Sequence, residues 1–144
     1  MNPRQIALVR SSWERVLPIK EEAGELLYRR LFELDHGLRS LFRGDISERG
    51  RTLMDMIGMV VSCLDRLGEI VPAVQELGRR HAGYGVEDAH YDIAGVALVS
   101  TLRAGLGDAL SREAEEAWAV AYATLTSVMK QGAAGASVQP VAAA

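Results

Sequence analysis

Apolar residues recur every three or four positions along almost the whole chain, which is the spacing of one helical face. No segment alternates apolar and polar residues over the length of a strand. The pattern predicts helices over about 3–17, 19–34, 46–68, 69–82, 88–107 and 112–131. We therefore expect an all-α protein of six to seven helices with short connections.

Polar residues at the expected helix ends support these boundaries. Asn2 before a proline is typical of an N-cap, and Ser111 can cap the last helix. Asp45 and Glu48 have the spacing of a capping-box variant. Gly83 and Gly85, in contrast, are expected to end the helix over 69–82.

The length of 144 residues fits one domain, which we place at residues 1–131. Residues 132–144 (GAAGASVQPVAAA) are uncharged and contain no large apolar side chain that could dock them. We expect them to form a flexible C-terminal tail.

Composition excludes several classes of protein. The chain is 49% hydrophobic and 24% charged with a net charge of −3, which argues against a disordered chain and against nucleic-acid binding by bulk positive charge. The single Cys63 excludes an intramolecular disulfide framework and a cysteine-based zinc site. No apolar stretch approaches the roughly 20 residues of a membrane span, so a cytoplasmic protein is expected.

His81 does not fit a plain apolar core. It follows Ile70, Val74 and Leu77 on the apolar stripe of the helix over 69–82. One ring N–H can reach the Leu77 carbonyl four residues earlier, which leaves the other nitrogen free to bind a metal ion. From spacing alone, a core histidine that bonds another helix remains the alternative.

The other two histidines have simpler interpretations. His36 falls in a turn between helices, where we expect it to be exposed to solvent. His90 falls at the start of a helix, where packing or capping is expected.

Three segments together resemble bacterial single-domain haemoglobins and the globin domain of flavohaemoglobins. They are LGRRHAGYGVEDAHY (77–91), GVALVSTLRAGLG (95–107) and AWAVAYATLTSVM (117–129), and the resemblance covers residues 3 to about 130 in order. It implies a globin fold around a pocket for haem b, iron protoporphyrin IX.

By this resemblance His81 is the proximal ligand of the haem iron, with Leu77 and Val86 packed on the same face of the cofactor. Phe42, in RSLF, matches the phenylalanine that packs against the porphyrin. Arg80 and Tyr84 border His81 in sequence, and each can either bond a propionate or lie in solvent.

The resemblance also implies a distal wall. Tyr28, in LLYRRLF, matches the tyrosine of bacterial haemoglobins whose hydroxyl stabilises a diatomic ligand that gains negative charge on binding. Arg49 and Leu53, in SERGRTLM, lie one helical turn apart and face the pocket together. Leu53 keeps the pocket apolar, which strengthens the tyrosine hydrogen bond.

Two positions depart from the relatives. Arg49 replaces the usual glutamine, and its long charged arm can turn toward a ligand or away to a propionate or solvent. The relatives also have a late carboxylate that, with a tyrosine, hydrogen-bonds near the proximal histidine. Here Tyr91 is present, but the carboxylate position falls near Ala133. We therefore expect a weaker electron push toward iron than in those relatives.

The resemblance implies reversible binding of dioxygen at a five-coordinate iron, with NO and CO as further diatomic ligands. The use is oxygen delivery, or nitric oxide dioxygenation with a separate reductase, because no flavin or nicotinamide domain follows the helices. A haem-based gas or redox sensor acting through a protein partner is the alternative. A helical bundle without a cofactor is a third possible interpretation of the sequence. The sequence leaves the oligomeric state open.

Overall fold

The computed structural model describes the backbone of residues 1–41 and 45–143 and the side chains up to residue 134. This part of the chain contains α-helices and short 3-10 helices but no strand, so the all-α prediction is confirmed. The α-helices are α1 (Pro3–Val16), α2 (Lys20–Leu34), α3 (Ile46–Ser62), α4 (Val71–Gly83), α5 (Asp88–Leu106) and α6 (Arg112–Ala143). The 3-10 helices are η1 (Leu17–Ile19), η2 (His36–Ser40), η3 (Leu64–Glu69) and η4 (Gly107–Ala109).

The predicted caps begin three of these helices. The Asn2 side chain accepts a hydrogen bond from the Gln5 N–H, and the Gln5 side chain accepts one in return. Asp45 accepts from the N–H of Ser47, and Ser111 accepts from that of Ala114. Each cap satisfies a backbone donor that the first turn of a helix leaves without an intrahelical partner.

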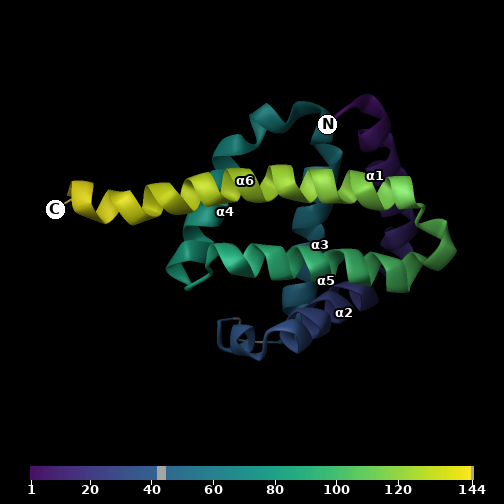
Figure 1. Cartoon of the computed structure of the whole chain (residues 1–144), viewed down its shortest axis with the longest axis horizontal. Coiled ribbons are helices and arrows are strands. Elements are labelled where there is room, and N and C mark those ends of the chain that lie inside the picture. The colour runs from purple at the N-terminus through teal and green to yellow at the C-terminus, as the bar shows by residue number, and fades with distance from the viewer. Residues whose placement is uncertain (42–44, 144) are drawn as a thin grey trace.

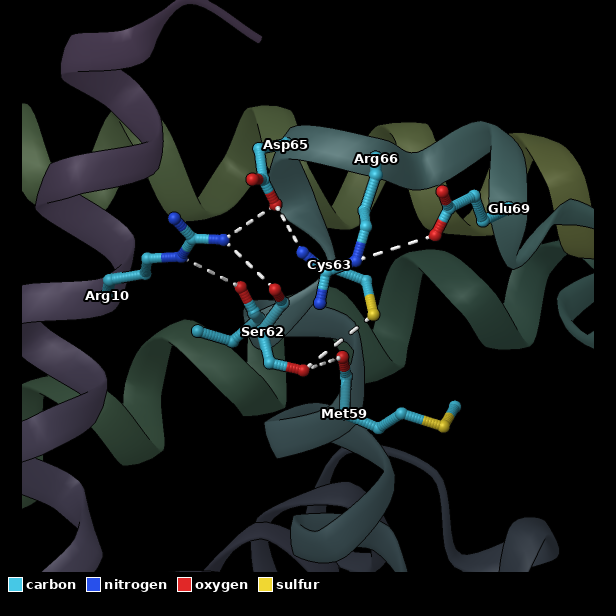
Figure 2. Close-up of polar contacts among 8 residues, drawn as sticks. Arg10, Met59, Ser62, Cys63, Asp65, Arg66 and Glu69 are labelled. Carbon is cyan, nitrogen blue, oxygen red and sulfur yellow. Dashed lines mark hydrogen bonds and ion pairs between the residues drawn. The ribbon is translucent and has the colours of Figure 1, made fainter.

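Helix α3 is shorter than we predicted from its apolar pattern. It ends at Ser62 instead of near Gly68, and η3 follows with Arg66 at φ −146° and ψ 46°. Arg10 of α1 donates to the carbonyls of Val61 and Ser62 at the end of α3 (3.2 and 3.0 Å), and it forms an ion pair with Asp65 at 2.9 Å (Figure 2). The end of α3 is therefore satisfied by a side chain from another helix.

The long helix α6 continues through residue 131, where we placed the end of the globular domain. Figure 1 shows its last turns extending beyond the other helices. The chain therefore stays helical across the predicted boundary. The division into a domain of residues 1–131 and a flexible tail remains a prediction.

The core consists of two main clusters of buried side chains. The larger joins α1, α3, α5 and α6 around Trp13 and Trp118, whose ring centroids are 6.2 Å apart. The smaller joins α2, η2 and α5 around Tyr28 and Phe32. None of the described helices is long and apolar enough to cross a membrane.

Two pairs of helices cross at glycines, where their backbones touch. A Cβ on Gly24 of α2 would lie 2.8 Å from the carbonyl oxygen of Gly50 in α3. A Cβ on Gly132 of α6 would lie 1.9 Å from the carbonyl oxygen of Gln75 in α4. Figure 1 shows α5 and α6 running antiparallel, with α3 crossing both and α4 crossing α6. These contacts fix α3 and α4, on which half of the expected site residues lie.

Candidate functional site

An apolar cavity lies between α2, α3, α4, α5 and α6. Five of the residues that the sequence singled out line it: Tyr28, Leu53, His81, Val86 and Tyr91. Most of the remaining lining is aliphatic, with side chains such as Leu31, Ile57, Val60 and Leu98. The fold therefore brings half of the predicted residues to one internal space.

His81 reaches this cavity from the last turns of α4. Its Nδ1 lies 2.8 Å from the Leu77 carbonyl oxygen, as we expected from the four-residue spacing. Because a carbonyl only accepts, Nδ1 carries the proton in the neutral ring and the Nε2 lone pair stays available. Burial lowers the pKa of His81, against the opposing effect of the Leu77 carbonyl, and so favours this neutral form.

The end of α4 fixes the chain around His81. The N–H of Val86 donates to the His81 carbonyl at 3.0 Å, which brings the Val86 side chain back to the cavity. Gly85 allows this return because it adopts a φ of +93°, in the left-handed region that glycine adopts at no steric cost. The turn predicted from the two glycines thus positions Val86 beside His81.

Tyr28 and Leu53 line the cavity from α2 and α3. Tyr28 is only 7% exposed, and its ring centroid lies 5.9 Å from that of Phe32. Burial raises the pKa of the Tyr28 phenol, so the hydroxyl stays protonated and can act as a donor. Leu53 contacts both core clusters and places an isobutyl group at the same wall.

Arg49 does not line this cavity. Its side chain is exposed on the first turns of α3. Its positive charge nevertheless lowers the pKa of Tyr28, in opposition to the effect of burial, so the two groups are electrostatically coupled. In this structure the arginine therefore lies outside the cavity wall and acts on Tyr28 through its charge.

Tyr91 presents a buried hydroxyl that has no hydrogen-bond partner among the described residues. Its backbone carbonyl accepts from the Tyr122 hydroxyl at 2.6 Å. Burial, and to a lesser extent the charge of Asp88, raise the pKa of the Tyr91 phenol. A buried polar atom left unpaired is uncommon in native proteins and indicates a missing partner, such as a ligand or water.

Three more predicted residues do not line the cavity. Leu77 packs with Val74 and Tyr91 and supplies the carbonyl that bonds His81, but it does not line the cavity. Arg80 is exposed and lies 3.8 Å from Glu76. Tyr84 is 60% exposed, with its ring centroid 6.5 Å from that of His81. Phe42 lies outside the described residues.

The structure confirms the interpretations of the other two histidines and extends one of them. His36 is exposed at the start of η2. The Nδ1 of His90 accepts from the Glu87 N–H at 2.8 Å and caps α5. His90 also lines the cavity, which we did not predict.

Four further residues that the sequence analysis did not single out belong to the cavity wall. Met56, Trp118, Tyr122 and Met129 all line the cavity. Met56 lies three residues after Leu53 on the same face of α3, so the helical spacing could have identified it. For residues of α6, the sequence gives no signal of which part of the core stays open.

Comparison with known proteins identifies the family of this chain. Residues 25–129 match the globin family. Neuroglobin from Danio rerio is 31% identical over 146 residues, covering 92% of both chains. A flavohemoprotein from Vibrio cholerae is 31% identical over 119 residues, but these span 78% of this chain and only 30% of that protein.

The fold has a close counterpart among solved structures. A hexacoordinated heme protein from an anhydrobiotic tardigrade superimposes with a TM-score of 0.84, covering 92% of this chain and 95% of the other at 18% identity. The fold, the family match and the similarity to neuroglobin agree over most of the chain. This protein belongs to the globin family.

Proposed function

We propose that this globin holds haem b through the Nε2 of His81 and binds dioxygen reversibly. The observation that carries the proposal is the His81 ring itself, since Leu77 holds its Nδ1 at 2.8 Å while the ring lines an apolar cavity. A metal-binding histidine whose other nitrogen donates to a carbonyl is held in one tautomer and one orientation.

The residues present fit this cofactor. A flat apolar macrocycle needs aliphatic and aromatic walls, and the cavity is lined mainly by such side chains. It also needs one neutral imidazole with an open nitrogen, which His81 provides. When bound, the haem would supply an iron atom that can take a diatomic ligand.

Tyr28 and Leu53 would control what binds there. The buried Tyr28 hydroxyl stays protonated, so it can donate a hydrogen bond to a ligand that gains negative charge. Leu53 and Met56 exclude water from the same space, which strengthens that bond by lowering the local dielectric. Dioxygen is favoured over carbon monoxide by this donor, because carbon monoxide gains less charge.

The composition of α3 supports a five-coordinate iron. No histidine occurs between Ile46 and Ser62, so α3 offers no imidazole to close the site. This separates the proposed coordination from that named for the tardigrade protein. Of the methionines of α3, Met54 and Met59 do not line the cavity, and we assign Met56, which does, to its apolar wall.

Two uses of such a site remain in the proposal. Oxygen binding or delivery needs only the site itself. Nitric oxide dioxygenation also needs an electron for each turnover, which we assign to a separate cytoplasmic reductase. The similarity to flavohemoproteins supports this second use.

Absorption spectra of the purified protein test the cofactor directly. We expect a five-coordinate ferrous spectrum after reduction and a persistent oxygenated form in air. His81→Ala should lose haem, whereas His36→Ala, a change at an exposed histidine, should keep both spectra. A wild-type protein that takes up no haemin, or a His81→Ala protein with unchanged spectra, would refute the assignment.

Consumption of nitric oxide separates the two uses. The oxygenated protein is mixed with nitric oxide, and nitrate and the oxidised protein are measured over repeated additions. Sustained turnover in the presence of a reductase fraction supports dioxygenation. A single stoichiometric reaction with no regeneration by any fraction leaves oxygen binding as the function.

A further inference from the structure

Lys130 is a half-buried lysine of α6 that packs against the ring of Tyr91. Its Nζ lies 5.8 Å from the ring centroid, within the range of a cation–π contact. The Tyr91 ring lines the same cavity as His81. A fixed positive charge therefore stands one aromatic ring away from the proposed cofactor site.

The position of this charge is set by the tightest helix crossing in the described structure. On either side of Lys130, a Cβ on Gly78 would lie 2.0 Å from the Met129 carbonyl oxygen, and one on Gly132 would lie 1.9 Å from that of Gln75. Gly78 precedes His81 by three residues in α4. Lys130 is thus held against the helix that carries the histidine.

No described carboxylate neutralises Lys130 by contact, because it forms no ion pair with another described side chain. The other nearby cations differ in this respect. Arg79 and Arg80 of α4 are exposed and paired with Glu76 at 2.8 and 3.8 Å. On α5, Asp88 raises the pKa of the Tyr91 phenol, but its side chain is exposed at the helix start.

We propose that Lys130 tunes the cofactor site by placing an unneutralised positive charge behind Tyr91, one helical turn before Ala133, so that the ferrous state is favoured over the ferric. This inference rests on the proposed haem function. A cation on the side of His81 would oppose the extra positive charge of ferric iron, because like charges repel. Dioxygen binding requires the ferrous state that Lys130 would favour.

The reduction potential of the haem-loaded protein tests this inference. In Lys130→Gln, the ratio of ferrous to ferric protein at a fixed potential should fall about threefold, as expected for a charge acting through a partly desolvated medium. Lys130→Glu should lower this ferrous-to-ferric ratio further, and Lys130→Arg should keep the wild-type ratio. Arg79→Gln is the matched control, because it removes an exposed and paired cation from α4 and should change the ratio little.

A second measurement tests the contact between Lys130 and the Tyr91 ring. The ring resonances of Tyr91 should shift in Lys130→Gln and remain in place in Arg79→Gln. An unchanged potential in a folded, haem-loaded Lys130→Gln would overturn the inference and leave the proposed function intact. Equal shifts in Arg79→Gln would also overturn it, since they would show a general charge effect. A wild-type chain without haem would refute the proposed function, and this inference with it.

Discussion

Gly78 of α4 lies so close to Met129 of α6 that a Cβ on the glycine would stand 2.0 Å from the methionine carbonyl oxygen. The neighbour is backbone, so it cannot move aside as a flexible side chain could. This contact holds the helix that carries His81 against α6.

Replacing Gly78 should therefore lower the stability of the fold. Gly78→Ala should reduce the free energy of unfolding by about 1–3 kcal/mol, because the two helices must separate to admit a methyl group. Gly83→Ala is the control, since a Cβ there meets nothing within 4 Å. Urea unfolding of both variants measures the difference, and equal stabilities would show that the crossing tolerates the methyl group.

The buried bond between Trp118 and Ser12 should also contribute to stability. The Trp118 Nε1–H donates to the Ser12 hydroxyl at 2.7 Å. Ser12→Ala leaves that indole N–H buried without an acceptor, at an expected cost of about 1–3 kcal/mol in thermal or urea unfolding. Ser40→Ala removes an exposed hydroxyl and should cost little. A Ser12→Ala protein as stable as Ser40→Ala would contradict the account.

The pair between Arg10 and Asp65 in Figure 2 should make stability depend on pH. The hydrogen bond from Arg10 lowers the pKa of Asp65 below its unfolded value of about 3.9. The wild type should therefore be more stable than Asp65→Asn above about pH 4, and the difference should vanish as the pH falls through the folded pKa. Urea unfolding from pH 7 to pH 3 measures this, with Asp108→Asn as the control. A difference that stays constant with pH would exclude the carboxylate as its source.

Tyr28→Phe should weaken dioxygen binding through faster dissociation. Loss of a hydrogen bond to a charged ligand costs about 1.5–3 kcal/mol, which corresponds to an increase of roughly tenfold or more in the dissociation rate. Carbon monoxide dissociation should change much less, and the exposed Tyr84→Phe should change neither rate. Stopped-flow measurement of both ligands distinguishes a donor role from a general loosening of the cavity, which would accelerate both.

Electron donation from the proximal side should be weak. The resemblance implies that the carboxylate position of the relatives falls near Ala133, and the Tyr91 hydroxyl has no described hydrogen-bond partner. We expect a ferrous iron–histidine stretching frequency below that of peroxidases in resonance Raman spectra, and a higher one in Ala133→Glu. A wild-type frequency as high as that of a peroxidase would refute this prediction.

Local signals predicted most of the fold. The caps at Asn2, Asp45 and Ser111 lie within a few residues of the donors that they satisfy, so the sequence contains the whole interaction. The end of α3 was misplaced because its carbonyls are satisfied by Arg10, which is about 50 residues away in the chain. A contact of that range leaves no trace in the helical periodicity.

The distinction between local and long-range contacts also applies to the site. The bond between His81 and Leu77 follows from a four-residue spacing, and the structure contains it. Packing or capping was expected of His90, but its place on the cavity wall depends on how α5 packs with the other helices. The contact between Lys130 and Tyr91 likewise arises only where α6 passes α5.

The crossing of α2 and α3 at Gly24 and Gly50 has a consequence for redesign. Tyr28 and Leu53 follow these glycines by about one helical turn, so the two backbones that carry them already touch. The chain cannot narrow the distal wall by bringing the helices closer. Selectivity for ligands of different size can therefore be changed by side-chain substitution on a frame whose spacing stays constant.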